Sequence, residues 1–89
     1  MNTQESVGPG STNEGARPMT FGEKAAGVSF NPSKDPEVDH VKRMSAELID
    51  KINALRRASS GEKARYFSKA ISHIEDGQMN AVKAITWKD

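Results

Sequence analysis

Two series of apolar residues, each repeating at intervals of three and four, are separated by the short segment Ser59-Ser60-Gly61-Glu62. This spacing places side chains along one helical face, so each series predicts a long helix with one apolar seam. The seam residues are Val38, Val41, Ser45, Leu48, Ile52 and Leu55 on the first helix, and Ala64, Phe67, Ile71, Ile74, Gln78, Ala81 and Ile85 on the second. The short turn predicts an antiparallel helical hairpin and an all-α fold. Pairing the seams outward from the turn places Gln78 close to Val41, and Trp87 beside the loop 31–35.

Residues with strong capping preferences mark the ends of both long helices. Asp35-Pro36-Glu37 combines an acidic N-cap with proline at the first helical position, so we expect the first long helix to begin there and to run to about Ala58. Ser59 and Glu62 are spaced for a capping box, and Gly61 allows a tight reversal. The second long helix is expected to start within this turn.

The chain before the first long helix predicts a short helix and a loop. Thr20 and Glu23 form another capping-box pattern, and Gly27 is placed to end a helix of two turns at most. Residues 28–34 are expected to form an extended loop, because the residue before a proline avoids the α region. Phe30 is the expected anchor of this loop.

Residues 1–19 are predicted to form a flexible N-terminal tail, and residues 20–89 the helical hairpin domain. The tail consists mostly of Gly, Ser, Thr, Asn, Glu and Pro, so it cannot offset its ordering entropy by burying apolar surface. Its last residues, Arg17, Pro18 and Met19, are still able to contact the folded part.

A two-helix hairpin has one internal seam and cannot surround it, so self-association is expected. The chain has 89 residues, of which 35% are hydrophobic, and the fraction of surface buried on folding falls as chains shorten. We therefore expect the hairpins to assemble into a homo-oligomeric helical bundle. The candidate interface residues off the seams are Met44 and Ile49 on the first helix, and a stripe of Ala70, Gly77 and Ala84 on the second. Small residues that are simply exposed are the alternative interpretation of this stripe.

Residue types that carry catalysis or bind metals are sparse in this chain. It has no cysteine and no phosphate-loop motif, and His40 and His73 lack metal-ligand spacing. Glu75 and Asp76 are adjacent and point about 100° apart on a helix, so they cannot act as a paired acid and base. No stretch approaches the roughly 20 apolar residues of a membrane span. We therefore expect no enzymatic activity, cofactor, metal or membrane insertion.

Basic residues gather around the expected turn. Residues 56–69 contain one acidic residue, Glu62, and five basic residues, which gives an excess of four positive charges. The basic residues are Arg56, Arg57, Lys63, Arg65 and Lys69. Arginine suits phosphate oxygens, and Tyr66 adds a ring on which a base can stack. A solvated turn explains the same residues. The net charge of +1 argues against duplex DNA or RNA as a partner, because that affinity rests on many phosphate contacts.

Several ordered segments resemble the hairpin domain of phage cyclic-nucleotide sponges: Thr20-Phe-Gly-Glu-Lys-Ala-Ala-Gly-Val-Ser-Phe-Asn-Pro-Ser, Asp35-Pro-Glu-Val-Asp, Ser60-Gly-Glu-Lys-Ala-Arg and Gln78-Met-Asn-Ala-Val-Lys-Ala-Ile-Thr-Trp-Lys-Asp. The short anti-CBASS sponges are the more similar group, and the anti-Thoeris sponges share the hairpin. The resemblance implies a phage protein that acts in the cytoplasm of the infected bacterium. It also implies a hexamer that binds cyclic messengers without cleaving them, and so blocks CBASS and, by extension, Thoeris effectors.

The resemblance also implies site residues for cyclic dinucleotides such as 3',3'-cGAMP. Lys24 corresponds to a phosphate ligand, and Phe21 with the Asn31-Pro32 loop would shape the pocket or stack on the bases. Core packing is the alternative role of Phe21 and of Phe30.

For cyclic trinucleotides, the resemblance implies Arg65, together with Lys69. Ala26 stands where the family can place a hydroxyl residue, which removes one possible donor. A different class of function, a small helical adaptor that binds a host protein, also remains open.

Overall fold

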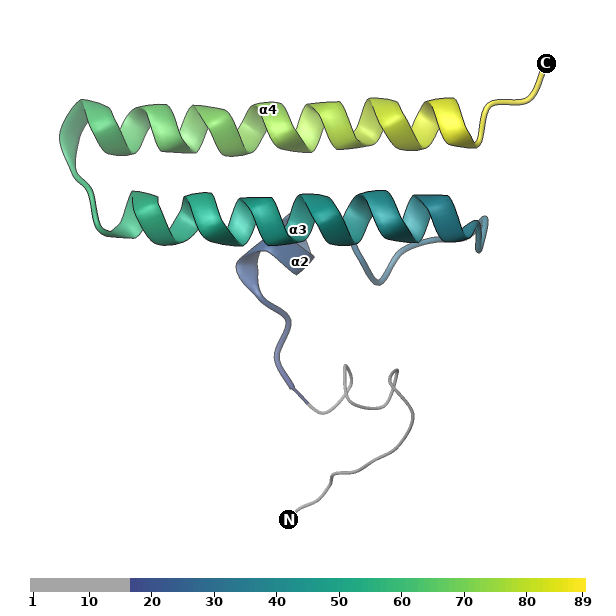
Figure 1. Ribbon diagram of the computed structural model, residues 1–89, viewed down its shortest axis with the longest axis horizontal. Coiled ribbons are helices and arrows are strands. Elements are labelled where there is room, and N and C mark those ends of the chain that lie inside the picture. Colours follow the sequence, from purple (N-terminus) through teal and green to yellow (C-terminus); the bar gives the residue numbers. More distant parts are fainter. Residues whose placement is uncertain (1–16) are drawn as a thin grey trace, which may run out of the picture.

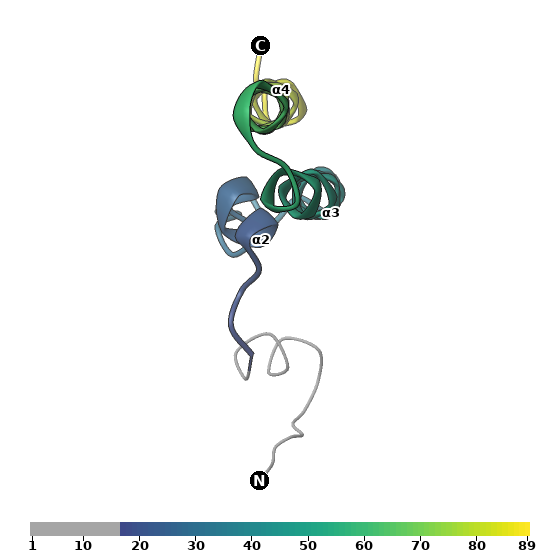
Figure 2. The same ribbon diagram turned by 90° about the vertical axis from the view of Figure 1, so that its left-hand side faces the viewer.

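The computed structural model describes residues 17–89 and shows three helices and no strand in that part of the chain. They are α2 (Phe21–Ala26), α3 (Pro36–Arg57) and α4 (Gly61–Ile85). α3 and α4 run antiparallel, side by side (Figure 1). α2 lies against α3 and has little contact with α4 (Figure 2). The all-α hairpin is therefore confirmed, while sixteen residues of the predicted tail lie outside the described residues.

The predicted ends of α2 and the start of α3 are confirmed by their caps. The Thr20 hydroxyl accepts from the Glu23 backbone N–H at 3.0 Å, and the Glu23 carboxylate accepts from the Thr20 N–H at 2.8 Å. Gly27 ends α2 in the left-handed region, with φ of 68°. The Asp35 carboxylate accepts from the Glu37 N–H at 2.8 Å and caps α3. These local hydrogen bonds satisfy N–H groups that a helix start leaves free.

The turn between α3 and α4 differs from the predicted capping box. Ser60, not Ser59, is the N-cap of α4, and its side chain makes no capping hydrogen bond. The Ser59 hydroxyl instead donates to the Leu55 carbonyl at 2.8 Å, and Glu62 pairs with Arg65. Gly61 does adopt a positive φ of 62°, so the expected tight reversal is confirmed.

Beyond Val38, the buried face of α3 is rotated away from the predicted seam. The buried positions of α3 are Val38, which belongs to that seam, and Lys42, Ala46 and Ile49, which do not. Of the predicted seam, Leu48 is 49% exposed and Leu55 is 41% exposed. On α4, by contrast, the buried residues Ile71 and Gln78 both belong to the predicted seam.

This rotation arises because α3 packs against α2 as well as α4. Ala46 forms a small apolar cluster with Ala26 of α2 and Val28 of the following loop, and Met19 packs against the same cluster. A helix with neighbours on two sides buries the side chains that point between those neighbours. The buried side chains of α3 therefore lie between α2 and α4, whereas the predicted seam assumed α4 as the single neighbour.

The register of the hairpin is close to the predicted one. Trp87 lines one cleft together with Ser33 and Asp35, which confirms its place beside the loop. Gln78 lines another cleft together with Lys42, the neighbour of its expected partner Val41.

One of the two predicted assembly residues on α3 is placed wrongly. Ile49 is fully buried within the chain and is therefore part of its core. Met44 is exposed, and Gly77 faces open space, with nothing within 4 Å of an added Cβ. Assembly through the exposed positions stays a prediction.

Candidate functional site

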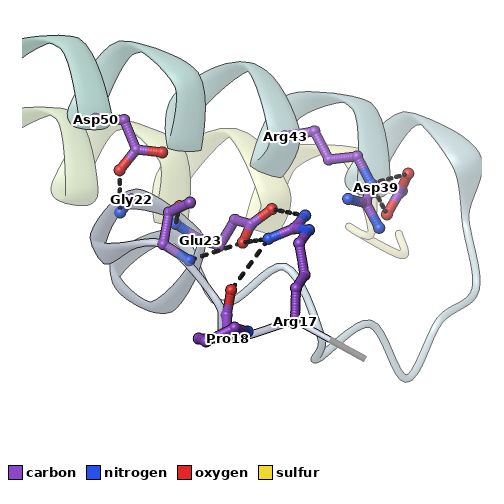
Figure 3. Close-up of polar contacts among 8 residues, drawn as sticks. Arg17, Pro18, Gly22, Glu23, Asp39, Arg43 and Asp50 are labelled. Carbon is purple, nitrogen blue, oxygen red and sulfur yellow. Dashed lines mark hydrogen bonds and ion pairs between the residues drawn. The ribbon is translucent and has the colours of Figure 1, made fainter. Parts of the chain in front are cut away.

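Short helix α2 carries two of the predicted dinucleotide residues and is held against α3 by a close backbone approach. A Cβ added to Gly22 would lie 2.9 Å from the Asp50 Cγ atom and closer still to the Ala46 carbonyl oxygen. Glycine lets the two backbones meet there, and the Gly22 N–H donates to the Asp50 carboxylate at 2.7 Å (Figure 3). The hydrogen bond to a charged acceptor fixes the position of α2 along α3.

A second clamp ties the chain before α2 to its first turn. Two nitrogens of the Arg17 guanidinium donate to the two oxygens of the Glu23 carboxylate at 2.8 and 2.7 Å (Figure 3). These hydrogen bonds, with that from the Thr20 N–H, lower the pKa of Glu23 from 4.5 to about 2, and the positive charge of Arg43 adds to this effect. Arg43 itself pairs with Asp39 at 3.1 Å. Glu23 is thus held in its charged form at the start of α2.

Phe21 and Lys24 both project from α2, but the Phe21 ring contacts a side chain of α3 whereas Lys24 has no polar partner among the described residues. Phe21 is 43% exposed, and the Arg56 guanidinium of α3 lies 5.2 Å from its ring centre. Arg56 is held in turn by hydrogen bonds to Asn53 and to Ser68 of α4. The Lys24 side chain is exposed and makes no hydrogen bond or ion pair with any described residue. α2 therefore presents one aromatic ring and one available ammonium group.

Asn31 and Pro32 line a cleft between the loop and the hairpin. The cleft has a volume of about 230 Å³. Its lining residues are Phe30, Asn31, Pro32, Ser33, Val38, Lys42, Val82 and Thr86. Neither Phe21 nor Lys24 lines this cleft, so one chain does not bring all four predicted dinucleotide residues into a single cavity.

The Asn31 side chain is engaged in shaping its own loop. Its oxygen accepts from the Ser33 hydroxyl at 2.7 Å and from the Lys34 N–H at 3.1 Å, and its nitrogen donates to the Asp35 carbonyl at 3.1 Å. Lys34 adopts a left-handed φ of 57° within this network. The amide thus supports the conformation of the loop, and its role toward a nucleotide stays a prediction.

Lys42 is the residue of this region that the sequence reasoning missed. Only 7% of Lys42 is exposed, and its ammonium group donates to the Gly27 and Phe30 carbonyls. Phe30, the predicted anchor of the loop, is instead 68% exposed, with the Lys42 ammonium 5.4 Å from its ring centre. The available signal was the position of a lysine at helical spacing between Val38 and Ala46.

The predicted trinucleotide residues Arg65 and Lys69 lie together on α4. The Arg65 guanidinium lies 4.7 Å from the centre of the Tyr66 ring, and the Lys69 ammonium lies 5.7 Å from it. Arg65 also pairs with Glu62 at 2.5 Å, and this hydrogen bond raises the pKa of Arg65. The tip therefore presents a cationic cluster around one exposed ring.

Ala26, the third predicted trinucleotide residue, lies elsewhere. It is buried against Val28 and Ala46 and borders a cleft with Gln78 and Met79. On α4, Gln78 is nine residues beyond Lys69, which corresponds to about 14 Å along the helix. A single chain therefore separates Ala26 from the cationic tip.

The described residues show neither a metal-binding cluster nor a membrane-spanning helix. Residues 17–89 contain no group of three or more His, Asp or Glu side chains able to hold a metal ion. Within the same range, no helix combines the length and the apolar character that crossing a bilayer requires.

The fold and the exposed cations together define a small helical-hairpin protein with a cationic tip and a short helix docked across its first long helix. A family model described as the Acb2/Tad1 hairpin domain matches residues 23–86. The chain therefore belongs to this family, that of the anti-CBASS and anti-Thoeris cyclic-nucleotide sponges. No curated protein and no solved structure matched the chain.

Proposed function

We propose that this chain is a phage protein that binds and sequesters cyclic dinucleotides, such as 3',3'-cGAMP, without cleaving them. It thereby blocks activation of CBASS effectors, and of Thoeris effectors where their messengers fit, in the cytoplasm of the infected bacterium. Cyclic trinucleotides are the second ligand class. The observation that carries the proposal is the match of residues 23–86 to the hairpin domain of the sponge family.

The rigid placement of α2 supports a role for Phe21 and Lys24 in dinucleotide binding. Preorganised groups bind more tightly because less conformational entropy is lost on association. The Gly22 contact and the capping box hold α2 before any ligand arrives. Lys24 then offers an ammonium to a phosphate, and Phe21 offers a ring to a base.

The separation of the candidate residues supports a site built by several copies of the chain. Phe21 and Lys24 lie outside the cleft of Asn31 and Pro32, and Ala26 lies away from Arg65. We therefore include a homohexamer in the proposal. Apolar side chains available for such contacts are exposed on all three helices: Phe21, Met44, Leu48, Leu55, Tyr66 and Met79.

Sequestration sets a demand on affinity. The protein must hold free messenger below the dissociation constant of the effector, and a nanomolar constant corresponds to about −12 kcal/mol. We expect Lys24→Ala to weaken dinucleotide binding by about 10- to 100-fold, the equivalent of one charge-assisted hydrogen bond. Lys51→Ala, at an exposed lysine of α3, is the matched control. Unchanged calorimetric affinity in a folded Lys24 variant would remove Lys24 from the site.

The trinucleotide part of the proposal is tested at the tip. Arg65→Ala should weaken binding of cyclic trinucleotides and leave dinucleotide binding unchanged, because Arg65 pairs with Glu62 and lies over the Tyr66 ring, both within α4. Lys51→Ala, which lies outside this basic cluster, again serves as the control. Equal losses for both ligand classes in calorimetry would contradict two separate sites.

The absence of cleavage is tested by recovery of the ligand. The protein is loaded with 3',3'-cGAMP, denatured, and the released nucleotide is analysed by liquid chromatography. Intact ligand supports sequestration, and a linear product would reveal an enzyme.

If no cyclic nucleotide shifts the melting temperature, the adaptor that binds a host protein becomes the better explanation.

A further inference from the structure

We propose that Lys42 is a positioning residue, which holds the loop 27–34 in the shape that the dinucleotide site requires. This inference rests on the proposed function, since it assumes that Asn31 and Pro32 form part of the ligand pocket. Lys42 is not a direct ligand in this proposal. It acts through the backbone that it grips.

The geometry joins α3 to both ends of one turn. The Phe30 N–H donates to the Gly27 carbonyl at 3.0 Å, which closes a turn directly after α2. The Lys42 ammonium donates to the carbonyls at the two ends of that turn, at 3.1 Å for Gly27 and also to Phe30. One side chain therefore restrains the turn from α3, fifteen and twelve residues further along the chain.

Lys42 is the one hydrogen-bonding link between this loop and the body of α3 in the described part of the chain. The other hydrogen bonds of residues 27–34 run to positions between Glu23 and Asp35. They shape the loop internally but do not attach it to the hairpin. Without Lys42, the turn from Gly27 to Phe30 would lose its support from α3, and the loop that carries Asn31 and Pro32 would lose its fixed place.

The charge of Lys42 is poorly explained by packing alone. An ammonium group has three donors and is costly to bury unless it is paired. The two carbonyls provide polar partners, yet Lys42 forms no salt bridge with a described carboxylate, and neither of the clefts that it borders is lined by an acidic residue. An apolar residue would fill the same space at lower cost, so the distinguishing feature of lysine here is the double hydrogen bond to the turn.

The restrained loop places the exposed Phe30 ring beside the clefts that Lys42 borders. Lys42 borders two of the clefts beside the loop, and its ammonium lies 5.4 Å from the centre of the exposed Phe30 ring. A ring held in this way can receive a base, because stacking needs a defined plane. Release of the turn would leave Phe30 and the Asn31-Pro32 segment to sample many orientations, and ligand binding would then have to order them.

The test compares Lys42→Met, which keeps the length of the side chain and removes its donors, with Lys42→Arg and with the matched control Lys51→Met. Calorimetry with 3',3'-cGAMP is run well below the melting temperature of each variant. We expect Lys42→Met to weaken binding at least about tenfold, equivalent to about 1.4 kcal/mol. Lys42→Arg should restore part of the affinity, and Lys51→Met should leave it unchanged. Unchanged affinity in folded Lys42→Met would overturn the proposal.

Hydrogen exchange provides a readout that does not depend on the ligand. In Lys42→Met, the amide of Phe30 should exchange at least about tenfold faster, while amides in the middle of α3 and α4 keep their protection. Protection of Phe30 equal to that of the wild-type protein would refute the positioning role. If the wild-type protein binds no cyclic nucleotide, the proposed function fails, whereas this exchange result still decides whether Lys42 orders the loop. Lys42→Gln replaces Lys42→Met in both measurements if the latter does not fold.

Discussion

Replacement of Gly22 by alanine tests how α2 is docked, because the same substitution elsewhere in the chain should have the opposite effect. The added Cβ would lie 2.9 Å from the Asp50 Cγ atom and nearer still to the Ala46 carbonyl oxygen. That oxygen belongs to the backbone of α3 and cannot rotate away. α2 must therefore shift outward, and the hydrogen bond of 2.7 Å from the Gly22 N–H to Asp50 is lost.

The expected cost follows from these two losses. Overpacking against a rigid neighbour costs about 1 to 3 kcal/mol, and a hydrogen bond to a charged group contributes about 1.5 to 3 kcal/mol. We expect Gly22→Ala to lower the free energy of unfolding by about 3 kcal/mol, since α2 can detach rather than bear the full strain. For a domain of this size, that corresponds to a fall in melting temperature of about 12 to 24 °C. Phe21 and Lys24 move with α2, so dinucleotide affinity should fall as well.

The control is Gly77→Ala on α4, where an added Cβ meets nothing within 4 Å. Alanine is favoured over glycine inside a helix by about 1 kcal/mol, so this variant should be more stable than the wild-type protein. Both are measured by urea denaturation followed by circular dichroism. Equal effects of the two substitutions would refute the close approach at Gly22. Loss of oligomerisation in Gly77→Ala, by sedimentation, would instead show that the small-residue stripe is an interface.

Two further predictions concern the charge and backbone of the loops beside the site. The pKa of Glu23 is lowered from 4.5 to about 2, so its stabilising contribution is present above pH 4.5 and is lost as the pH falls toward 2. The difference in unfolding free energy between the wild-type protein and Glu23→Gln should therefore be constant near neutral pH and should shrink between pH 4.5 and pH 2. A constant difference down to about pH 2 would contradict the Arg17 clamp. Lys34 has a left-handed φ of 57°, which favours glycine, so Lys34→Gly should raise the free energy of unfolding by about 0.5 to 1 kcal/mol in urea titrations, and a decrease would show that the strain is absent.

The helix boundaries were predictable because their signals are local. The pairs Thr20 with Glu23 and Asp35 with Glu37 bond within one helical turn, so their residue types and spacing suffice to predict the cap. The turn at Gly61 was predictable for the same reason. The proposed box at Ser59 was wrong because α4 begins one residue later than expected, with Ser60 as its N-cap, and Glu62 pairs with Arg65 instead.

The candidate site was predictable as a set of residue types and not as an arrangement. The resemblance pointed to Phe21, Lys24 and Arg65, and the structure leaves all three at least partly exposed. No local signal indicated that Arg56 covers the Phe21 ring or that Ala26 is buried between α2 and α3. Those contacts join positions twenty or more residues apart, and spacing along the chain says nothing about them.

The amino-acid sequence alone thus determined that this chain forms two long helices in a hairpin and one short capped helix, because caps, turns and apolar periodicity act within a few residues. The tertiary structure decided which face of α3 is buried and which side chain holds the loop. Docking of α2 at Gly22 turns the buried stripe toward Ala46 and Ile49. The same docking brings two backbone carbonyls to Lys42. A lysine at that position becomes a structural link only when a distant turn arrives beside it, and that is a property of the packed chain.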